Sequence, residues 1–280
     1  MLSYRHAFHA GNYADVLKHL VLCRILVYLT QKPAPLCYVD THAGAGGYDL
    51  ASEQSRKTGE FRQGFGLLWQ RADLPPVIAA YRDLVARFNP PGELKLYPGS
   101  PWLAQQLLRE QDRLELCELH SSEYPLLQQR FAGDRRVHCH NEDGFIKSIA
   151  LTPPREKRGL VLIDPSYEMK DDYRVVVNHL KMLHKRFATG VYALWYPIVD
   201  QYRLNELEAG IIKSAIPRID LYEISLAADH RRPGMSGAGM MVINPPWKLR
   251  RDMQEALAFL APMFSVDGKP HYRVKELIGE

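Results

Sequence analysis

The sequence predicts an α/β fold with one mainly parallel sheet. Short apolar segments of strand length alternate with longer segments whose apolar residues recur at helical spacing. Residues 160–163 (LVLI) have no polar face, which is typical of a central strand that helices cover on both sides. The stretch 44–47 (GAGG) directly follows another apolar run, and glycines there let the backbone approach a ligand closely.

Composition narrows the class of protein. The chain has 280 residues, of which 46% are hydrophobic, enough for one large domain with a full core. A net charge of +4 is compatible with a nucleic-acid partner. Because the amino terminus lacks a signal-peptide core and no apolar run reaches membrane-spanning length, we expect a cytoplasmic protein with no membrane partner. The cysteines form no paired spacing, which predicts reduced thiols at Cys23, Cys37, Cys117 and Cys139. VHCH (137–140) puts two histidines on one side of a strand, but because no second ligand pair is in view we expect no metal site.

The first half of the chain predicts a helix, a strand and a helical insertion. Residues 12–31 (NYADVLKHLVLCRILVYLTQ) have helical periodicity. Residues 35–50 (PLCYVDTHAGAGGYDL) indicate a strand, a glycine-rich turn and the start of a helix. Residues 50–110 carry further helical stretches, and we interpret them as a small helical subdomain inserted into a single domain that spans residues 1–280.

The second half predicts strands separated by helices, and then a hairpin. The expected strand segments are 113–120, 135–144, 159–167, 190–198, 220–228 and 238–247. Helical segments separate the earlier ones, so those strands are expected to be parallel. Only the loop DHRRPGMSG separates the last two, which predicts an antiparallel hairpin at one edge of the sheet.

Polar residues follow successive strands at the point where each strand ends. They are the glycine-rich turn at Gly44, then Glu118, then Asp143 with Gly144, and then Asp164. The carboxyl ends of parallel strands meet at one edge, where ligands bind in open α/β sheets. Glu118 can accept hydrogen bonds from ribose hydroxyls, and Asp143 from an adenine amine, an arrangement that suits S-adenosylmethionine. Taken one at a time, Asp-Gly and Asp-Pro are also ordinary turns, and Glu118 is an ordinary solvated strand end.

The glycine spacing argues against two other nucleotide-binding classes. G-x-G-G lacks the third glycine of the dinucleotide fingerprint, and no Walker lysine follows it. A nicotinamide dehydrogenase and a P-loop enzyme are therefore disfavoured.

In this order the residues resemble those of class I S-adenosylmethionine-dependent methyltransferases. The tetrapeptide DPSY (164–167) is similar to the [DNS]-P-P-[YF] signature of amino-methyltransferases, with Ser166 in place of the second proline. Over its whole length the chain more closely resembles the ribosomal RNA large-subunit methyltransferase J family, bacterial enzymes that methylate adenine N6 in 23S ribosomal RNA. The motifs that carry this resemblance are YRHAFHAGNYADVLKHLVL (4–22), YVDTHAGAGGYDL (38–50), YPGSP (97–101), HNEDGF (140–145) and LIDPSY (162–167).

The resemblance implies a Rossmann-like sheet, S-adenosylmethionine as cofactor and roles for individual residues. Asp164 and the carbonyl of Pro165 would accept the two N–H groups of the target amine, and Tyr167 would stack on the base. The implied cofactor contacts are His19, His42, Gly44, Ser100, Glu118, Asp143, Gly144 and Asp164. The expected contacts with substrate RNA are Tyr4, His6 and Lys18. We expect a monomer.

Alternatives remain at this stage. NPPW (244–247) fits the wider signature letter for letter, but it follows the final predicted strand, and we interpret it as a structural turn. A DNA adenine-N6 or protein glutamine methyltransferase of the same fold would share the signature. A glutamine enzyme would not need the aromatic and basic residues of the amino terminus. A non-catalytic RNA-binding module would be expected to have lost Asp164 or the glycine-rich turn.

Overall fold

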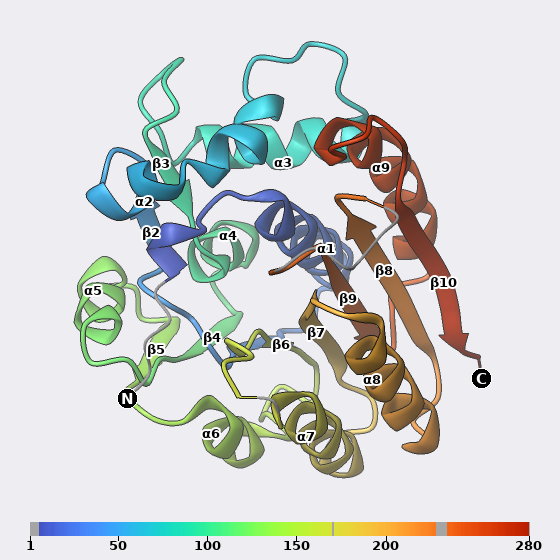
Figure 1. The fold of residues 1–280 in the computed structure, drawn as a ribbon. Helices are drawn as coiled ribbons and strands as arrows, with labels where there is room; N and C mark the ends of the chain where they lie inside the picture. Colours follow the sequence, from blue (N-terminus) through green and yellow to red (C-terminus); the bar gives the residue numbers. More distant parts are fainter. Residues whose placement is uncertain (1–5, 170, 228–233, 280) are drawn as a thin grey trace.

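An eight-stranded sheet forms the centre of the molecule, and helices cover both of its faces (Figure 1). The computed structural model describes residues 6–169, 171–227 and 234–279. In sheet order the strands are β10 (Tyr272–Ile278), β8 (Ile219–Ser225), β9 (Gly237–Ile243), β7 (Val191–Ile198), β6 (Gly159–Ile163), β1 (Cys37–Asp40), β4 (Arg113–Cys117) and β5 (Val137–His140). The five strands from β7 to β5 are parallel, which confirms the predicted class.

Strand β1 lies at the centre of the parallel part of the sheet. Its neighbours are β4 on one side and β6 on the other. The chain therefore runs outward from β1 first in one direction and later in the other. Loops that leave β1, β4 and β6 diverge at this point, which is where open α/β sheets bind ligands.

One helix layer is built around α1 (Tyr13–Leu29). Residues 13–23 are buried throughout, because the sheet lies on one side of α1 and other helices lie around it. Asn12 starts the helix, and its side chain accepts a hydrogen bond from the Asp15 amide. The other helices of this layer are α3 (Pro76–Ala86), α4 (Ser100–Leu107) and α9 (Leu249–Phe264).

The opposite face packs against a second helix layer. Its core includes β6 residues that alternate with those facing α1, such as Val161 and Ile163. This alternation explains why residues 160–163 have no polar face: both sides of the strand are covered. The helices here are α6 (Gly144–Leu151), α7 (Asp172–Arg186) and α8 (Gln201–Lys213), and α5 (Glu123–Arg130) packs beside β5.

Two sequence expectations about strands were incomplete. β8 and β9 do pair antiparallel, as predicted, but β10 adds to the outside of β8 and forms the edge of the sheet. The glycine-rich turn leads into β2 (Gly47–Asp49) and not into a helix. β2 pairs with β3 (Leu96–Pro98), which lies far along the chain. A strand of three residues is too short for its periodicity to be recognised in the sequence.

The insertion between β1 and β4 is mainly helical. It contains α2 (Glu53–Thr58), two 3-10 helices (Glu60–Gln63 and Phe65–Leu68) and α3, before β3 and α4 return the chain to the sheet. Glu60 accepts hydrogen bonds from Asn12 and pairs with His9, so the insertion holds the chain that precedes α1. None of the helices within the described ranges has the length and apolar character needed to cross a membrane.

Candidate active site

A cavity of about 270 Å³ opens at the carboxyl edge of the parallel strands. The loops after β1, β4, β5 and β6 contribute to its wall, as the pattern of strand ends predicts. The predicted site residues that line it are His6, Lys18, His19, His42, Gly44, Ser100, Glu118, Asp143, Gly144, Asp164 and Pro165. Residues from seven separate segments of the chain therefore meet in one place.

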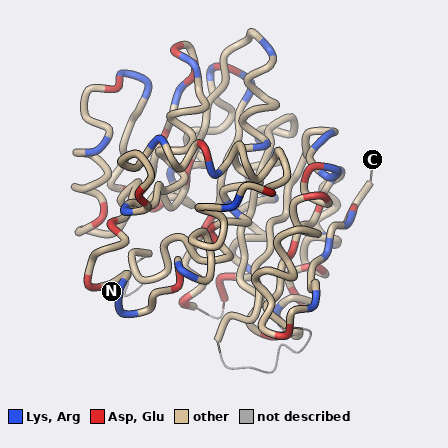
Figure 2. Tube along the Cα trace, turned by 90° about the horizontal axis from the view of Figure 1, so that it is seen from above, with Lys and Arg blue, Asp and Glu red and all other residues tan. Residues whose placement is uncertain are grey.

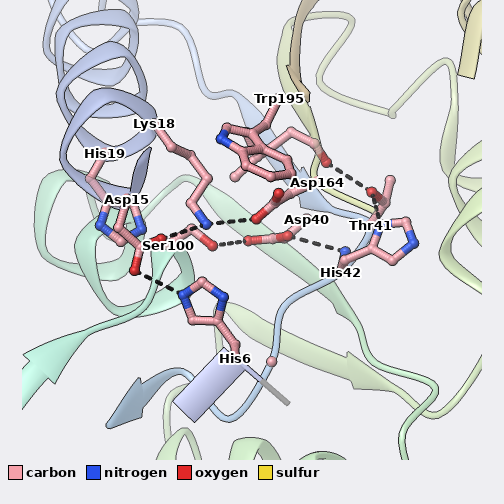
Figure 3. A network of polar contacts seen from close by, with 12 residues as sticks. His6, Asp15, Lys18, His19, Asp40, Thr41, His42, Ser100, Asp164 and Trp195 are labelled. Atoms are coloured by element: carbon pink, nitrogen blue, oxygen red, sulfur yellow. Dashed lines mark hydrogen bonds and ion pairs between the residues drawn. The ribbon is translucent and has the colours of Figure 1, made fainter. Parts of the chain in front are cut away.

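Asp164 lies at the end of β6 and is held by a buried lysine (Figure 3). Lys18 Nζ on α1 is 2.6 Å from Asp164 Oδ2 and 2.9 Å from Asp15 Oδ1. Burial alone would lower the pKa of Lys18, but Asp15 and Asp164 outweigh that effect and hold the pKa well above its usual value. Lys18, which we predicted as an RNA contact, is thus placed between two carboxylates.

A second buried carboxylate, Asp40, ends β1 beside Asp164 (Figure 3). Its Oδ2 atom accepts hydrogen bonds of 2.7 Å from the hydroxyls of Ser100 and Tyr38. Burial raises the pKa of Asp40 to about 6, even though these two hydroxyls favour the ionised form. Ser100, predicted as a cofactor contact, therefore also fixes a strand-end carboxylate.

The raised pKa of Asp40 predicts a pH-dependent contribution to stability. The pKa of an aspartate in the unfolded chain is about 3.9. Between about pH 4 and 6 the folded chain therefore keeps a proton on Asp40 that the unfolded chain has lost. Stability from Asp40 is therefore present below pH 4 and is lost as the pH rises to about 6. We expect the free energy of unfolding of Asp40→Asn, relative to wild type, to increase by on the order of 2 kcal/mol from pH 4 to 7 in denaturant titrations. A constant difference over that range would contradict this.

Glu118 closes the glycine-rich turn against the end of β4. Its Oε2 atom accepts from the Gly44 amide at 2.8 Å, and Oε1 accepts from the His120 amide at 2.6 Å. Burial raises the pKa of Glu118. Gly44 adopts φ +59°, in the left-handed region, and a Cβ at this position would lie 2.2 Å from the Tyr48 hydroxyl.

Asp143 and Gly144 bring the start of α6 against the end of β1. Asp143 caps the helix, because its Oδ1 accepts from the amides of Phe145 and Ile146. A Cβ on Gly144 would lie 1.8 Å from the carbonyl oxygen of Thr41, so only glycine permits this approach. Asp143 and Gly144 therefore begin a helix and do not form the Asp-Gly turn that the dipeptide alone favours, and both line the cavity.

Two histidines in the wall are held in the neutral form. Burial lowers the pKa of His19 to about 3 and that of His42 to about 4. His19 Nδ1 is 3.0 Å from the Tyr97 hydroxyl, and the two rings are stacked. Within the described part of the chain, His19 Nε2 is buried and has no hydrogen-bond partner. A buried nitrogen of this kind in a cavity wall is a candidate contact for a bound molecule.

Tyr167 is the predicted residue that the described structure does not bring into the cavity wall. Tyr167 has φ +52°, its hydroxyl donates to the Trp195 carbonyl at 2.9 Å, and its ring packs against Tyr173. The indole of Trp195, which the sequence did not single out, lines the cavity in its place. Tyr4 lies outside the described residues, as do Arg231 and Arg232 of the loop before β9.

Asn244 of NPPW has a structural role. Its amide donates to the carbonyls of Ala188 and Gly190 at 2.8 and 2.7 Å, and its Oδ1 atom accepts from Arg218. Ile243 pairs with Tyr192 at the start of β7, so Asn244 lies at the sheet edge opposite Asp164. This supports the interpretation of NPPW as a structural turn.

Comparison with known proteins identifies the family of this chain. The model of the family described as Ribosomal RNA large subunit methyltransferase D, RlmJ, matches residues 33–277. The chain belongs to this family. Ribosomal RNA large subunit methyltransferase J of Escherichia coli (strain K12) is 48% identical over 280 residues, covering 100% of both chains. The protein of that name from Haemophilus influenzae (strain ATCC 51907 / DSM 11121 / KW20 / Rd) is 46% identical over 281 residues, again covering 100% of both.

Two solved structures are also similar to this chain. A Legionella pneumophila str. Philadelphia 1 protein is 36% identical, with a TM-score of 0.89 over 96% of this chain and 98% of its own. A probable spermidine synthase from Corynebacterium glutamicum ATCC 13032 is 13% identical, with a TM-score of 0.53 over 97% of this chain and 77% of its own. The second likeness concerns the fold alone.

Sequence reasoning missed three residues of the site: Asp15, Asp40 and Trp195. Asp40 ends a strand that precedes the glycine-rich turn, so the strand-end argument that selected Glu118 and Asp164 also applies to it. Asp15 is three residues before Lys18 on one helix, a spacing that brings the two side chains together. Nothing in the sequence distinguishes Trp195 from other apolar residues of β7.

Proposed function

We propose that this protein transfers a methyl group from S-adenosylmethionine to the exocyclic N6 of an adenine in 23S ribosomal RNA. Membership of a ribosomal RNA large-subunit methyltransferase family supports the reaction type and the substrate class. The single observation that carries the proposal is the placement of Asp164. It ends β6 in the same cavity as the glycine-rich turn and Glu118.

The residues of the cavity suit S-adenosylmethionine. The backbone at Gly44 and Gly144 lines the cavity directly, and His19 Nε2 is a buried polar atom without a partner among the described residues. Glu118 and Asp143 provide carboxylates for hydroxyl and amine donors. When bound, the cofactor supplies an electrophilic methyl group on a sulfonium centre.

The chain itself orients the amine and receives its proton. Asp164 and the carbonyl of Pro165 accept the two N–H groups, which directs the nitrogen lone pair toward the methyl group. Asp164 then holds the proton that the amine loses. Positioning and electrostatics account for most of the rate enhancement, because no side chain forms a covalent bond with the substrate. Contact of Tyr4 and His6 with the RNA, and stacking by Tyr167, are further parts of the proposal.

The test is transfer of labelled methyl groups to separate pools of RNA, DNA and protein. We expect label in 23S ribosomal RNA and its recovery as N6-methyladenosine after digestion to nucleosides. Label in DNA or in glutamine would select a rival enzyme of the same fold. A folded protein that binds RNA but transfers no label would be a binding module.

Glu118→Ala is expected to weaken cofactor binding. The change removes a carboxylate from the cavity and leaves the Gly44 amide without its acceptor, so the glycine-rich turn loses its support. We expect the Kd for S-adenosylmethionine to rise about tenfold or more in calorimetry. Glu142→Ala is the control, since Glu142 is exposed and pairs with Lys147. Equal affinity for wild type and Glu118→Ala would show that Glu118 is not a cofactor contact.

A further inference from the structure

Asp15 joins the amino-terminal segment to Asp164. Its Oδ2 atom accepts from the Gly11 amide at 2.9 Å and lies 2.8 Å from His6 Nε2. Its Oδ1 atom is 2.9 Å from Lys18 Nζ, which is in turn 2.6 Å from Asp164 Oδ2. Figure 3 shows His6, Asp15, Lys18 and Asp164 in succession along one side of the site.

The two carboxylate oxygens of Asp164 differ in their contacts. Lys18 contacts Oδ2, and within the described ranges no hydrogen bond engages Oδ1. Asp15 pulls the ammonium group toward α1, so Lys18 does not bridge both oxygens of Asp164. The side chain of Asp15 is only 2% exposed, so its negative charge acts on Lys18 with little screening by water.

We propose that Asp15 is a positioning residue, which keeps Lys18 on one oxygen of Asp164 and leaves the other for the target amine. The carboxylate of Asp15 also contacts His6 and the Gly11 amide. One side chain therefore positions the segment that precedes α1 and, through Lys18, the carboxylate of Asp164. This inference rests on the proposed function, because it concerns the reaction at Asp164. Asp15 acts through Lys18 and does not itself touch the reacting atoms.

A double-mutant cycle tests this. Asp15→Asn keeps the size of the side chain but removes its charge, and we expect kcat to fall about 100-fold while the Kd for S-adenosylmethionine stays within about threefold. In a Lys18→Met background the same substitution should change kcat by less than about threefold, because its target is gone. Equal effects of Asp15→Asn in both backgrounds would overturn the proposal. Methylation by the wild-type protein tests the proposed function separately.

Asp252→Asn is the matched control. Asp252 is also a buried carboxylate that pairs with a cation of α1, Arg24, but it lies outside the cavity. Its loss should lower the free energy of unfolding, as loss of Asp15 does, without a change in kcat. Should Asp15→Asn fail to fold, Asp15→Glu retains the charge, and partial recovery of kcat relative to Asp15→Ala is expected. No recovery would contradict the charge-based role.

A second inference concerns Trp247, which belongs to a motif that the active site does not use. Asn244 adopts φ +54°, and its hydrogen bonds to Ala188, Gly190 and Arg218 fix the loop that carries Pro245 and Pro246. The indole at the end of this loop is 72% exposed. The loop therefore holds a large aromatic ring in solvent, where a nucleic-acid base can stack on it.

A basic groove lies beside this indole. Its wall includes Arg218, Arg250 and Arg251, and the ammonium group of Lys248 is 4.8 Å from the centre of the Trp247 ring. Arg250 is paired with the two acidic residues of the groove, Asp220 and Glu276. Arg251 lies 3.6 Å from Asp252, but its side chain is 76% exposed, so it can still reach a phosphate. Arg218 contacts a neutral amide, so the groove keeps positive charge.

We propose that this groove binds an unpaired segment of the substrate RNA. A base would stack on Trp247, while Arg251 and Lys248 would meet phosphates. The groove is at the sheet edge opposite Asp164, so only an RNA long enough to pass around the protein reaches both sites. Elsewhere, Lys and Arg are interspersed with Asp and Glu along the chain (Figure 2), so local geometry is what singles out this surface.

Two substrates of different length test the groove. Methylation is measured with a short stem-loop around the mapped adenine and with a long 23S fragment. For the paired change Trp247→Ala with Arg251→Ala, we expect KM for the long RNA to rise about tenfold and KM for the stem-loop to stay constant. Trp247→Phe should restore part of the difference, because stacking is retained.

The groove experiment has a matched control and two outcomes that would contradict a proposal. Arg155→Ala removes a side chain that is 79% exposed and lies outside the groove, and it should leave both KM values unchanged. Unchanged KM for the long RNA in the Trp247 variant would overturn the RNA assignment, and the groove would then belong to a protein partner. Loss of activity on both RNAs in wild type would instead contradict the proposed function.

Discussion

Asp164→Ala is expected to abolish methyl transfer while the protein stays folded. In the proposed reaction, this change removes the acceptor for the target amine and the group that takes its proton. It also leaves Lys18 with Asp15 as its remaining carboxylate partner in the described structure, so the positive charge of Lys18 is less well compensated in the cavity. We expect kcat for 23S RNA to fall by on the order of 10³-fold or more in single-turnover methylation assays.

The fold should survive this change because β6 owes its stability to residues 159–163, which are buried on both faces. Circular dichroism and a cooperative thermal transition check that point. Asn244→Ala is the matched control at the second candidate signature: it removes the hydrogen bonds to Ala188, Gly190 and Arg218 and should lower stability but leave kcat unchanged. If Asn244→Ala were inactive and Asp164→Ala active, the catalytic motif would be NPPW.

Gly144→Ala is expected to have the largest effect on stability and to remove cofactor binding. The new methyl group would lie 1.8 Å from the Thr41 carbonyl oxygen, and both atoms belong to backbone segments that a rotamer change cannot relieve. Either α6 or the turn after β1 must move. We expect the free energy of unfolding to fall by about 3 kcal/mol, and S-adenosylmethionine affinity to become undetectable by calorimetry, since the shifted turn carries His42 and Gly44.

Ile146→Ala provides the comparison within the same helix. The Ile146 side chain is 70% exposed, so its truncation should change the free energy of unfolding by less than about 0.5 kcal/mol. Wild-type stability together with wild-type affinity in Gly144→Ala would show that the two backbones are not in contact in solution. Loss of affinity without loss of stability would place the adjustment in the glycine-rich turn alone.

The sequence by itself determined the class of fold and the edge at which the site lies. Apolar runs that end in Glu118 and Asp164 identify parallel strands, and the strand end is a local property that each run carries in its own residues. The resemblance of whole motifs then indicated the family, and the comparisons confirmed it. Short strands that depend on a distant partner were missed, as β2 and β10 show.

Only the tertiary structure decided how the site is charged and which side chains face it. Lys18 and Asp164 are 146 positions apart, and Asp40 receives the Ser100 hydroxyl across 60 positions, so neither contact leaves a trace in local sequence. The raised pKa of Asp40 follows from complete burial, which depends on how the helices pack and not on its neighbours in the chain. Similarly, Tyr167 is turned toward the Trp195 carbonyl by a contact with β7 that the signature cannot encode. The sequence pattern determines which residues reach the sheet edge. Packing between residues that are far apart in the chain determines their protonation, their hydrogen-bond partners and the direction in which their side chains point.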